Sequence, residues 1–134
     1  MIVGIGCDLV ELKKIEDSFQ RGKEAFLRHV LSVREQEVFY QFKTERRQIE
    51  WLSGRFAAKE AYSKAVGTGF GGSINLNDIE VLSDQLGKPV IAISNSAILR
   101  VTSDMACHVS ITHTDVTAGA VVIIENKHRG RVTL

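Results

Sequence analysis

Apolar and polar residues alternate along the first part of the chain, and this alternation predicts a β-strand. Between residues 3 and 9, apolar side chains take every second position, and Gly4, Gly6 and Asp8 stand between them. A period of two is that of a strand with one apolar face. Glycine weakens a strand unless something must come close to it. We therefore expect a close neighbour at the two glycines, with Asp8 at the end of the face that they line.

Helical spacing replaces this alternation over the next part of the chain. A short helix is expected over residues 13–20, and Gly22 should break it. Residues 32–35 form the capping box Ser-Val-Arg-Glu, in which the serine hydroxyl accepts from the glutamate amide while the glutamate side chain reaches back. The helix that this box opens should run to about residue 42.

A long helix is predicted over residues 45–66. Its apolar stripe consists of Ile49, Leu52, Phe56 and Ala57. Gly67 follows as the expected C-terminal cap, because glycine readily adopts the left-handed conformation that ends many helices.

Strands dominate the second half of the chain. We expect one further short helix, over residues 96–103. The predicted strands cover residues 79–81, 90–93, 108–112 and 118–124. The fold class is therefore α+β, a compact domain with antiparallel strands packed on the long central helix.

Length and composition describe a single domain. The chain has 134 residues, of which 44% are hydrophobic, and its mean hydropathy is near zero, so it can bury a real core. We assign residues 1–126 to this domain and residues 127–134 to a basic tail. No apolar run approaches the roughly 20 residues that cross a bilayer, and no signal segment begins the chain. The expected location is therefore the cytoplasm, with no membrane partner.

Charge and cysteine usage exclude further classes. The net charge is +1, from 17 basic and 16 acidic residues, whereas general nucleic-acid binding needs a concentrated basic face. Cys7 and Cys107 have no metal-ligand spacing and are expected to be reduced packing residues.

The run GRFAAKEAYSKA, residues 54–65, carries candidate chemistry on the long helix. Glu60 and Lys64 lie one turn apart on one face, where a carboxylate and an ammonium could hold a divalent cation and a phosphate side by side. The small alanines of this run let other backbone approach closely. The alternative is an ordinary surface ion pair, which is common and individually weak.

The glycine-rich segment after this helix suggests a phosphate cradle only superficially. A dinucleotide fingerprint has a strand before its glycines, whereas here a helix comes first, and the C-terminal end of a helix has the wrong dipole for an anion. If Gly67, Gly69 and Gly71 bind phosphate, Lys64 must supply the charge and the glycine amides must turn inward. The alternative is a helix cap followed by a simple loop.

Two histidines and one arginine are weaker candidates. His108 and His113 face opposite sides of a regular strand, so joint metal ligation is not expected, and His108 suits a packed or hydrogen-bonded role. Arg55 could bind phosphate or form an ion pair with another helix.

Four segments together resemble one enzyme family. They are GIGCDLVEL (residues 4–12), GRFAAKEAYSKAVGTGFG (54–71), Gly87-Lys88-Pro89 and HVSITHT (108–114). In order and spacing they are similar to the holo-acyl-carrier-protein synthases, the small stand-alone phosphopantetheinyl transferases of bacterial fatty-acid synthesis. The resemblance runs from about residue 2 to residue 125.

This resemblance implies a reaction and a site. The enzyme would move phosphopantetheine from coenzyme A to a serine of an acyl carrier protein and release adenosine 3',5'-bisphosphate, with Mg²⁺ as cofactor. Asp8 and Glu60 would bind the metal, and Glu60 would also orient or deprotonate the serine. Lys64 would neutralise the pyrophosphate. The implied coenzyme A contacts are Lys64, Gly67, Gly69, Gly71, His113 and Thr114.

The resemblance also implies an assembly and a partner surface. The family forms homotrimers with active sites at the subunit interfaces. The helix around Lys13, Lys14 and Arg21 would dock the acidic carrier. Lys14 stands where relatives often have arginine; lysine keeps the charge but loses the bidentate fork, which bears on the choice of carrier.

Two other functions remain open from the sequence. One is a transferase for a different carrier, in polyketide or peptide synthesis, although the short chain favours the fatty-acid type. The other is a non-catalytic module that binds coenzyme A, which the presence of both acids disfavours.

Overall fold

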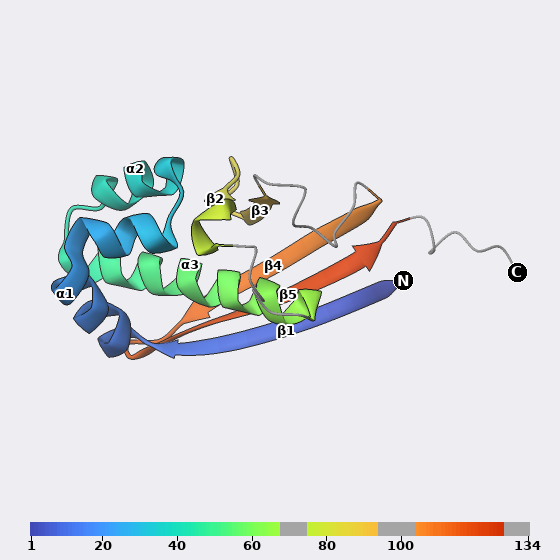
Figure 1. Ribbon diagram of the computed structural model, residues 1–134, viewed down its shortest axis with the longest axis horizontal. Helices are drawn as coiled ribbons and strands as arrows, with labels where there is room; N and C mark the ends of the chain where they lie inside the picture. The colour runs from blue at the N-terminus through green and yellow to red at the C-terminus, as the bar shows by residue number, and fades with distance from the viewer. Residues whose placement is uncertain (68–74, 94–103, 128–134) are drawn as a thin grey trace, which may run out of the picture.

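The protein is built in three layers around one long helix. The computed structural model describes residues 1–67, 75–93 and 104–127. Its elements are β1 (Ile2–Glu11), α1 (Leu12–Val30), α2 (Val33–Gln41), α3 (Glu45–Val66), the 3-10 turn η1 (Leu76–Asp78), β2 (Ile79–Ser83), β3 (Pro89–Ile93), β4 (Met105–His113) and β5 (Thr117–Asn126). Figure 1 shows α3 lying along the sheet of β1, β5 and β4, with α1, α2 and the β2–β3 hairpin on its other side.

Both sheets are antiparallel. The larger sheet has the strand order β1-β5-β4, and β2 pairs only with β3 among the described residues. The predicted α+β architecture, with strands packed on a central helix, is confirmed. The helix expected over residues 96–103 and most of the tail expected over residues 127–134 lie outside the described residues.

The glycine face of β1 is the face that meets α3. A Cβ atom placed on Gly4 would overlap the carbonyl oxygen of Ala65, and one on Gly6 would overlap that of Ala61. The close neighbour expected at these glycines is therefore the α3 backbone, which the alanines allow to approach.

The apolar face of β1 points away from this core. Ile5 is 65% exposed and Leu9 is 73% exposed, and Cys7 is exposed between them. The expectation that Cys7 is a packing residue is therefore wrong for the single chain, because its face of the sheet has no covering layer among the described residues. Cys107 is partly buried and packs against the core, as expected.

Helix α3 is buried around most of its circumference between Ile49 and Ala65. The predicted apolar stripe is present, with Leu52 and Ala57 fully buried, but Ser53, Arg55 and Lys59 are buried as well. A single stripe is typical of a helix on the surface. Here the helix lies between two layers, so almost every side must be covered.

Local signals set most helix ends correctly. The capping box of Ser32 and Glu35 is present at the start of α2, and Gly67 caps α3 with a left-handed φ of 93°. The break expected at Gly22 is confirmed one residue later, where α1 has a kink. After one non-helical residue, Lys23 with φ 47°, the chain turns back into a helix that continues to Val30.

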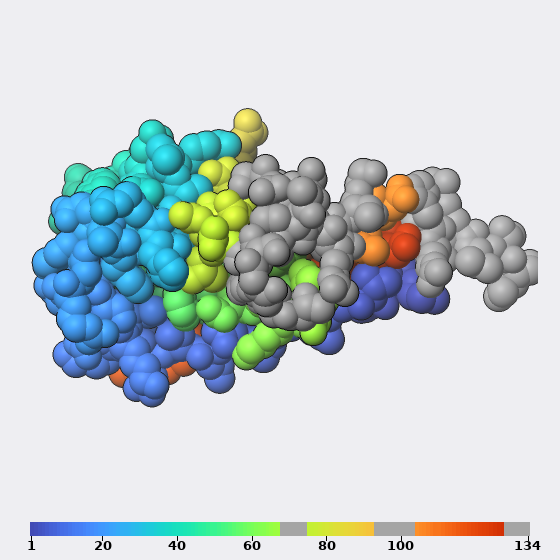
Figure 2. Space-filling view, viewed as in Figure 1, coloured from blue at the N-terminus to red at the C-terminus, as the bar shows by residue number. Residues whose placement is uncertain are grey.

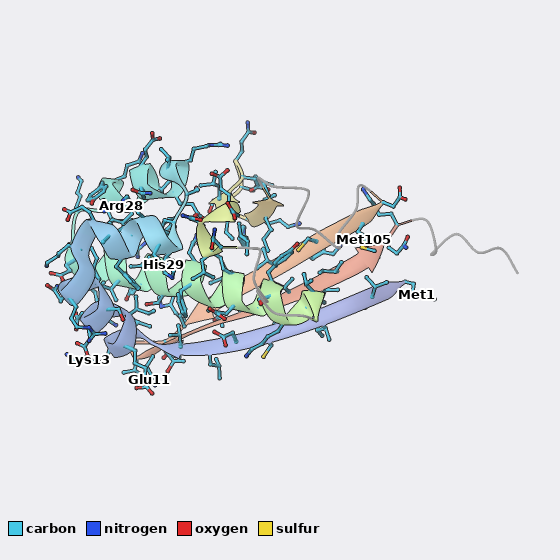
Figure 3. The ribbon with its side chains drawn as sticks, in the orientation of Figure 1. Met1, Glu11, Lys13, Arg28, His29 and Met105 are labelled. Carbon is cyan, nitrogen blue, oxygen red and sulfur yellow. The ribbon has the colours of Figure 1, made fainter. Side chains whose placement is uncertain are left out.

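Of the described helices, α1 and α2 lie at one end of the sheet (Figure 1). Figure 2 shows α1 and α2 covering one end of the molecule, and β1 running along its lower edge. In Figure 3, Glu11 and Lys13 lie at the covered end, while Met1 and Met105 lie at the opposite end of the sheet. No helix among the described residues is long and apolar enough to cross a membrane.

Candidate active site

Asp8, Glu60 and Lys64 come together where β1 passes under α3. The Lys64 Nζ atom donates to Asp8 Oδ1 at 3.0 Å and to the Cys7 carbonyl oxygen at 3.1 Å. The Asp8 side chain is 17% exposed, whereas that of Lys64 is 57% exposed. The glycine contacts of β1 bring the two backbones close enough for this pairing. Residues from two distant sequence segments thus form one polar cluster at the surface.

The charges of this cluster act on one another. Burial raises the pKa of the Glu60 carboxyl, the nearby Asp8 charge raises it further, and Lys64 opposes both effects. The hydrogen bond with Asp8 raises the pKa of the Lys64 ammonium. The Asp8 and Glu60 carboxylates therefore repel each other. A cation bound beside both of them, in addition to Lys64, would relieve that repulsion.

This donor set suits a hard divalent cation. Mg²⁺ binds carboxylate oxygens and commonly takes only one or two protein carboxylates, keeping waters and substrate phosphates as its other ligands. No cluster of three or more metal-ligating side chains occurs in the described part of the chain. Asp8 and Glu60 therefore fit an open Mg²⁺ site, in which waters and a phosphate would supply the other ligands.

The glycines predicted to bind coenzyme A are only partly described. Gly67 is exposed, ends α3 and comes three residues after Lys64, so the chain that leaves the helix begins beside the cluster. Gly69 and Gly71 lie outside the described residues.

His113 and Thr114 do not join this cluster within one chain. His113 lines a pocket of about 230 Å³ together with Arg47, Trp51, Arg55, Ser83 and Pro89, and none of Asp8, Glu60 and Lys64 lines it. The Thr114 hydroxyl accepts from the Thr117 amide at 3.0 Å and so closes the β4–β5 turn. The predicted coenzyme A residues therefore fall into two groups.

Arg55 is the functional candidate that sequence reasoning left undecided. Its side chain donates to the Val81 carbonyl at 3.1 Å and to Ser83 Oγ at 3.3 Å, and it lies 4.7 Å from the centre of the Trp51 ring. Burial lowers the pKa of the guanidinium. It makes no ion pair with a carboxylate of the described residues, although the nearby Glu35 charge opposes the effect of burial on its pKa and Glu50 lines the same pocket. The sequence signal that could have indicated this role is Trp51, which stands one helical turn before Arg55.

His108 lies on the other face of the sheet. Its Nε2 atom is 2.9 Å from Glu125 Oε1, and both side chains are about half exposed. The expected hydrogen-bonded role is therefore correct, and His108 takes no part in either group of site residues.

Comparison with known proteins defines the class of this fold and site. Residues 4–121 match the model of the 4'-phosphopantetheinyl transferase superfamily. The holo-[acyl-carrier-protein] synthase of Staphylococcus haemolyticus is 41% identical over 127 residues, covering 95% of this chain and 99% of that protein. The one from Bacillus subtilis is 47% identical over 125 residues, covering 93% and 97%.

Solved structures give the same result. The holo-(acyl-carrier-protein) synthase of Bacillus anthracis, determined in complex with CoA (3',5'-ADP), superposes with a TM-score of 0.80 at 40% identity, covering 94% of this chain and 98% of that one. The Neisseria meningitidis enzyme gives a TM-score of 0.83 at 35% identity, covering 93% and 99%.

The chain therefore belongs to the 4'-phosphopantetheinyl transferase superfamily, and within it to the holo-[acyl-carrier-protein] synthases. The family, the α+β fold and the transferase activity inferred from the sequence are confirmed.

Proposed function

We propose that Asp8, Glu60 and Lys64 form the centre at which phosphopantetheine passes from coenzyme A to a serine of apo acyl carrier protein. The observation that carries this proposal is the contact of Lys64 with Asp8 beside a Glu60 whose pKa is raised. Two carboxylates and one ammonium at a single surface point match what a transferring phosphoryl group requires, namely positioning and charge neutralisation.

Each residue has a defined role in this transfer. The serine oxygen attacks the pyrophosphate phosphorus nearer the pantetheine, a new serine O–P bond forms, and adenosine 3',5'-bisphosphate leaves with the bridging oxygen. Glu60 orients the serine hydroxyl or accepts its proton, directly or through a water. Lys64 neutralises the pyrophosphate. Mg²⁺, held by Asp8 and Glu60, would supply further neutralisation of the phosphate oxygens.

We also propose that the enzyme works as a homotrimer with active sites between subunits. Its support is twofold: one face of the β1-β5-β4 sheet exposes Ile5, Leu9 and Val121, and His113 lies in a pocket apart from Lys64. A large exposed apolar patch is typical of an interface. The nucleotide end of coenzyme A would then contact Arg55, His113 and Thr114 of one copy. The neighbouring copy would bind the same coenzyme A through Lys64, Gly67, Gly69 and Gly71.

Complementation between two variants tests this assembly. Asp8→Asn leaves the His113 pocket intact, whereas His113→Ala leaves the Asp8 cluster intact. Co-expressed trimers should regain activity above that of either variant alone, because some interfaces would pair two intact halves. A monomer by light scattering, or no regain of activity in mixed trimers, would contradict the proposal.

The proposed partner surface is the first half of α1, which carries Lys13, Lys14 and Arg21 and would meet an acidic carrier. Lys14 forms no ion pair within the described residues, so its charge remains available, whereas Lys13 already pairs with Asp17 at 3.1 Å.

We place the enzyme in the cytoplasm, in keeping with its two free cysteines. Residues 1–126 would form the catalytic domain and residues 127–134 a basic tail.

Intact-mass analysis of apo carrier protein tests the function directly. Incubation with coenzyme A, Mg²⁺ and this enzyme should add one phosphopantetheine to the carrier. A fatty-acid carrier modified faster than polyketide or peptide carriers supports the fatty-acid assignment, and the reverse order contradicts it. Coenzyme A binding without any mass increase would instead indicate a non-catalytic module.

A further inference from the structure

A buried ion pair holds α3 on the side opposite the sheet. The Lys59 Nζ atom lies 2.5 Å from Glu35 Oε1, and both side chains are 0% exposed. Lys59 also donates to the Val30 carbonyl at 2.6 Å. The Glu35 carboxylate accepts from the Ser32 amide at 2.8 Å and from the Val81 amide at 2.7 Å. Two side chains thus connect the end of α1, the start of α2, β2 and α3.

Stability alone does not account for this pair. Taking two charges out of water is costly, and apolar residues of similar volume often replace a buried ion pair without loss of stability. Burial lowers the pKa of the Lys59 ammonium, with the Glu35 charge opposing that effect. An ion pair differs from an apolar contact in being directional, since its hydrogen bonds fix where each atom lies.

The pair complements the contacts on the sheet side of α3. There, Gly4 and Gly6 of β1 meet the α3 backbone at Ala65 and Ala61. Lys59 directly precedes Glu60 in the chain. Its side chain binds Glu35 on the side of α3 that is opposite the glycine contacts. The turn that bears Glu60 is therefore held from two sides, by backbone contact and by an ion pair.

A small rotation of α3 would matter at Glu60. With side chains reaching about 6 Å from a helix axis, a rotation of about 10° moves a carboxylate by about 1 Å. A misplacement of that size can cost about a hundredfold in rate. We infer that Glu35 and Lys59 are positioning residues that fix the rotation of α3 and so aim Glu60 and Lys64 at Asp8. This inference rests on the proposed catalytic role of that cluster.

The double variant Glu35→Gln with Lys59→Met tests the inference. It removes both buried charges together, so neither is left unpaired, and the glutamine oxygen can still accept from one of the two backbone amides that Glu35 binds, those of Ser32 and Val81. We expect a folded enzyme whose kcat is lower by about tenfold, while KM for the carrier changes less than about twofold. In the presence of coenzyme A, Mn²⁺ binding followed by electron paramagnetic resonance should weaken by about threefold or more.

A matched control breaks an exposed ion pair over the same junction. Arg34 pairs with Glu80 at 3.2 Å, and the Arg34 side chain is 71% exposed. Arg34→Met should leave kcat and Mn²⁺ binding unchanged. If the double variant does not fold, Glu35→Asp keeps both charges but shortens the carboxylate by one methylene, and it should show the same losses in a milder form.

The outcomes separate this inference from the proposed function. Asp8→Asn and Glu60→Gln should abolish Mn²⁺ binding; if they bind it normally, the site assignment fails. The other case is that Asp8→Asn and Glu60→Gln lose Mn²⁺ binding while the folded double variant, or Glu35→Asp in its place, keeps normal kcat and Mn²⁺ binding. The Glu35–Lys59 pair then acts only on stability, and the inference is overturned.

Discussion

Gly6 of β1 lies against Ala61 of α3 with no room for a side chain between them. A Cβ atom at Gly6 would overlap the Ala61 carbonyl oxygen and lie 2.6 Å from the Ala65 amide nitrogen. Both are backbone atoms of a buried helix, so neither can move aside cheaply. This contact is what brings Asp8 to Lys64.

Gly6→Ala should therefore be among the most damaging single substitutions. We expect a loss of about 3 kcal/mol or more in the free energy of unfolding, as overpacking against rigid backbone allows, measured by urea denaturation. Gly22→Ala serves as the control, because its Cβ would make one tight contact, 3.0 Å from Phe26 Cβ, whereas that of Gly6 would overlap backbone atoms. Equal losses for the two variants would mean that the methyl group added at Gly6 costs no more than the one added at Gly22. In that case β1 and α3 can move apart to make room for it.

Asp8→Asn and Glu60→Gln should each nearly abolish transfer while leaving the fold intact. Each removes one of the two carboxylates that would hold the cation, and we expect a fall in kcat/KM of about a hundredfold or more. Steady-state rates at limiting Mg²⁺ and circular dichroism check the two halves of this prediction. Near wild-type turnover of either variant would remove that residue from the metal site.

Lys64→Ala should weaken coenzyme A binding by about tenfold or more, which is about 1.4 kcal/mol. Its ammonium stands at the junction of Asp8 and the end of α3, where the pyrophosphate is expected. Lys127→Ala, beyond the end of β5, is the matched control and should change the affinity little. Calorimetry that gives the two variants equal affinities would place the pyrophosphate elsewhere.

Lys14→Glu should raise KM for the carrier by about threefold to tenfold at low salt, with little change in KM for coenzyme A. Exposed charges are screened over about 8–10 Å at physiological salt, so the effect should shrink as salt rises. Steady-state kinetics at two ionic strengths measure it. An unchanged carrier KM at low salt would show that docking uses another surface.

The raised pKa of Glu60 predicts a pH effect on stability in metal-free buffer. A carboxyl whose native pKa lies above its ordinary value of 4.5 keeps its proton to higher pH in the folded state. The free energy of unfolding therefore falls as pH rises through that window. Glu60→Gln should lack this decline and should have a higher Tm than the wild type at pH 7.

Thermal unfolding by scanning calorimetry checks the Glu60 prediction. Added Mg²⁺ should reverse the order, because only the wild type can bind it and gain stability. Glu24→Gln, on an exposed position of α1, should follow the wild type throughout. A wild-type Tm equal to that of Glu60→Gln at every pH would show that the Glu60 charge is not strained.

Local interactions explain what the sequence determined by itself. The Ser32–Glu35 box and the Gly67 cap are made by residues that lie within three or four positions of one another, so their hydrogen bonds can be read from spacing alone. The motif residues Asp8, Glu60 and Lys64 were also identified from sequence, because a resemblance over four ordered segments requires no coordinates.

Only the tertiary structure decided which faces are buried and which residues meet. The apolar side of β1 is exposed at Ile5 while its glycine side is buried, because the close approach of α3 requires small residues more than apolar ones. Glu35 was recognised as a cap, but its second role as the partner of Lys59 depends on a contact across 24 positions. The placement of His113 away from Lys64 likewise follows from the way α3 lies along the sheet (Figure 1), which no spacing along the chain encodes.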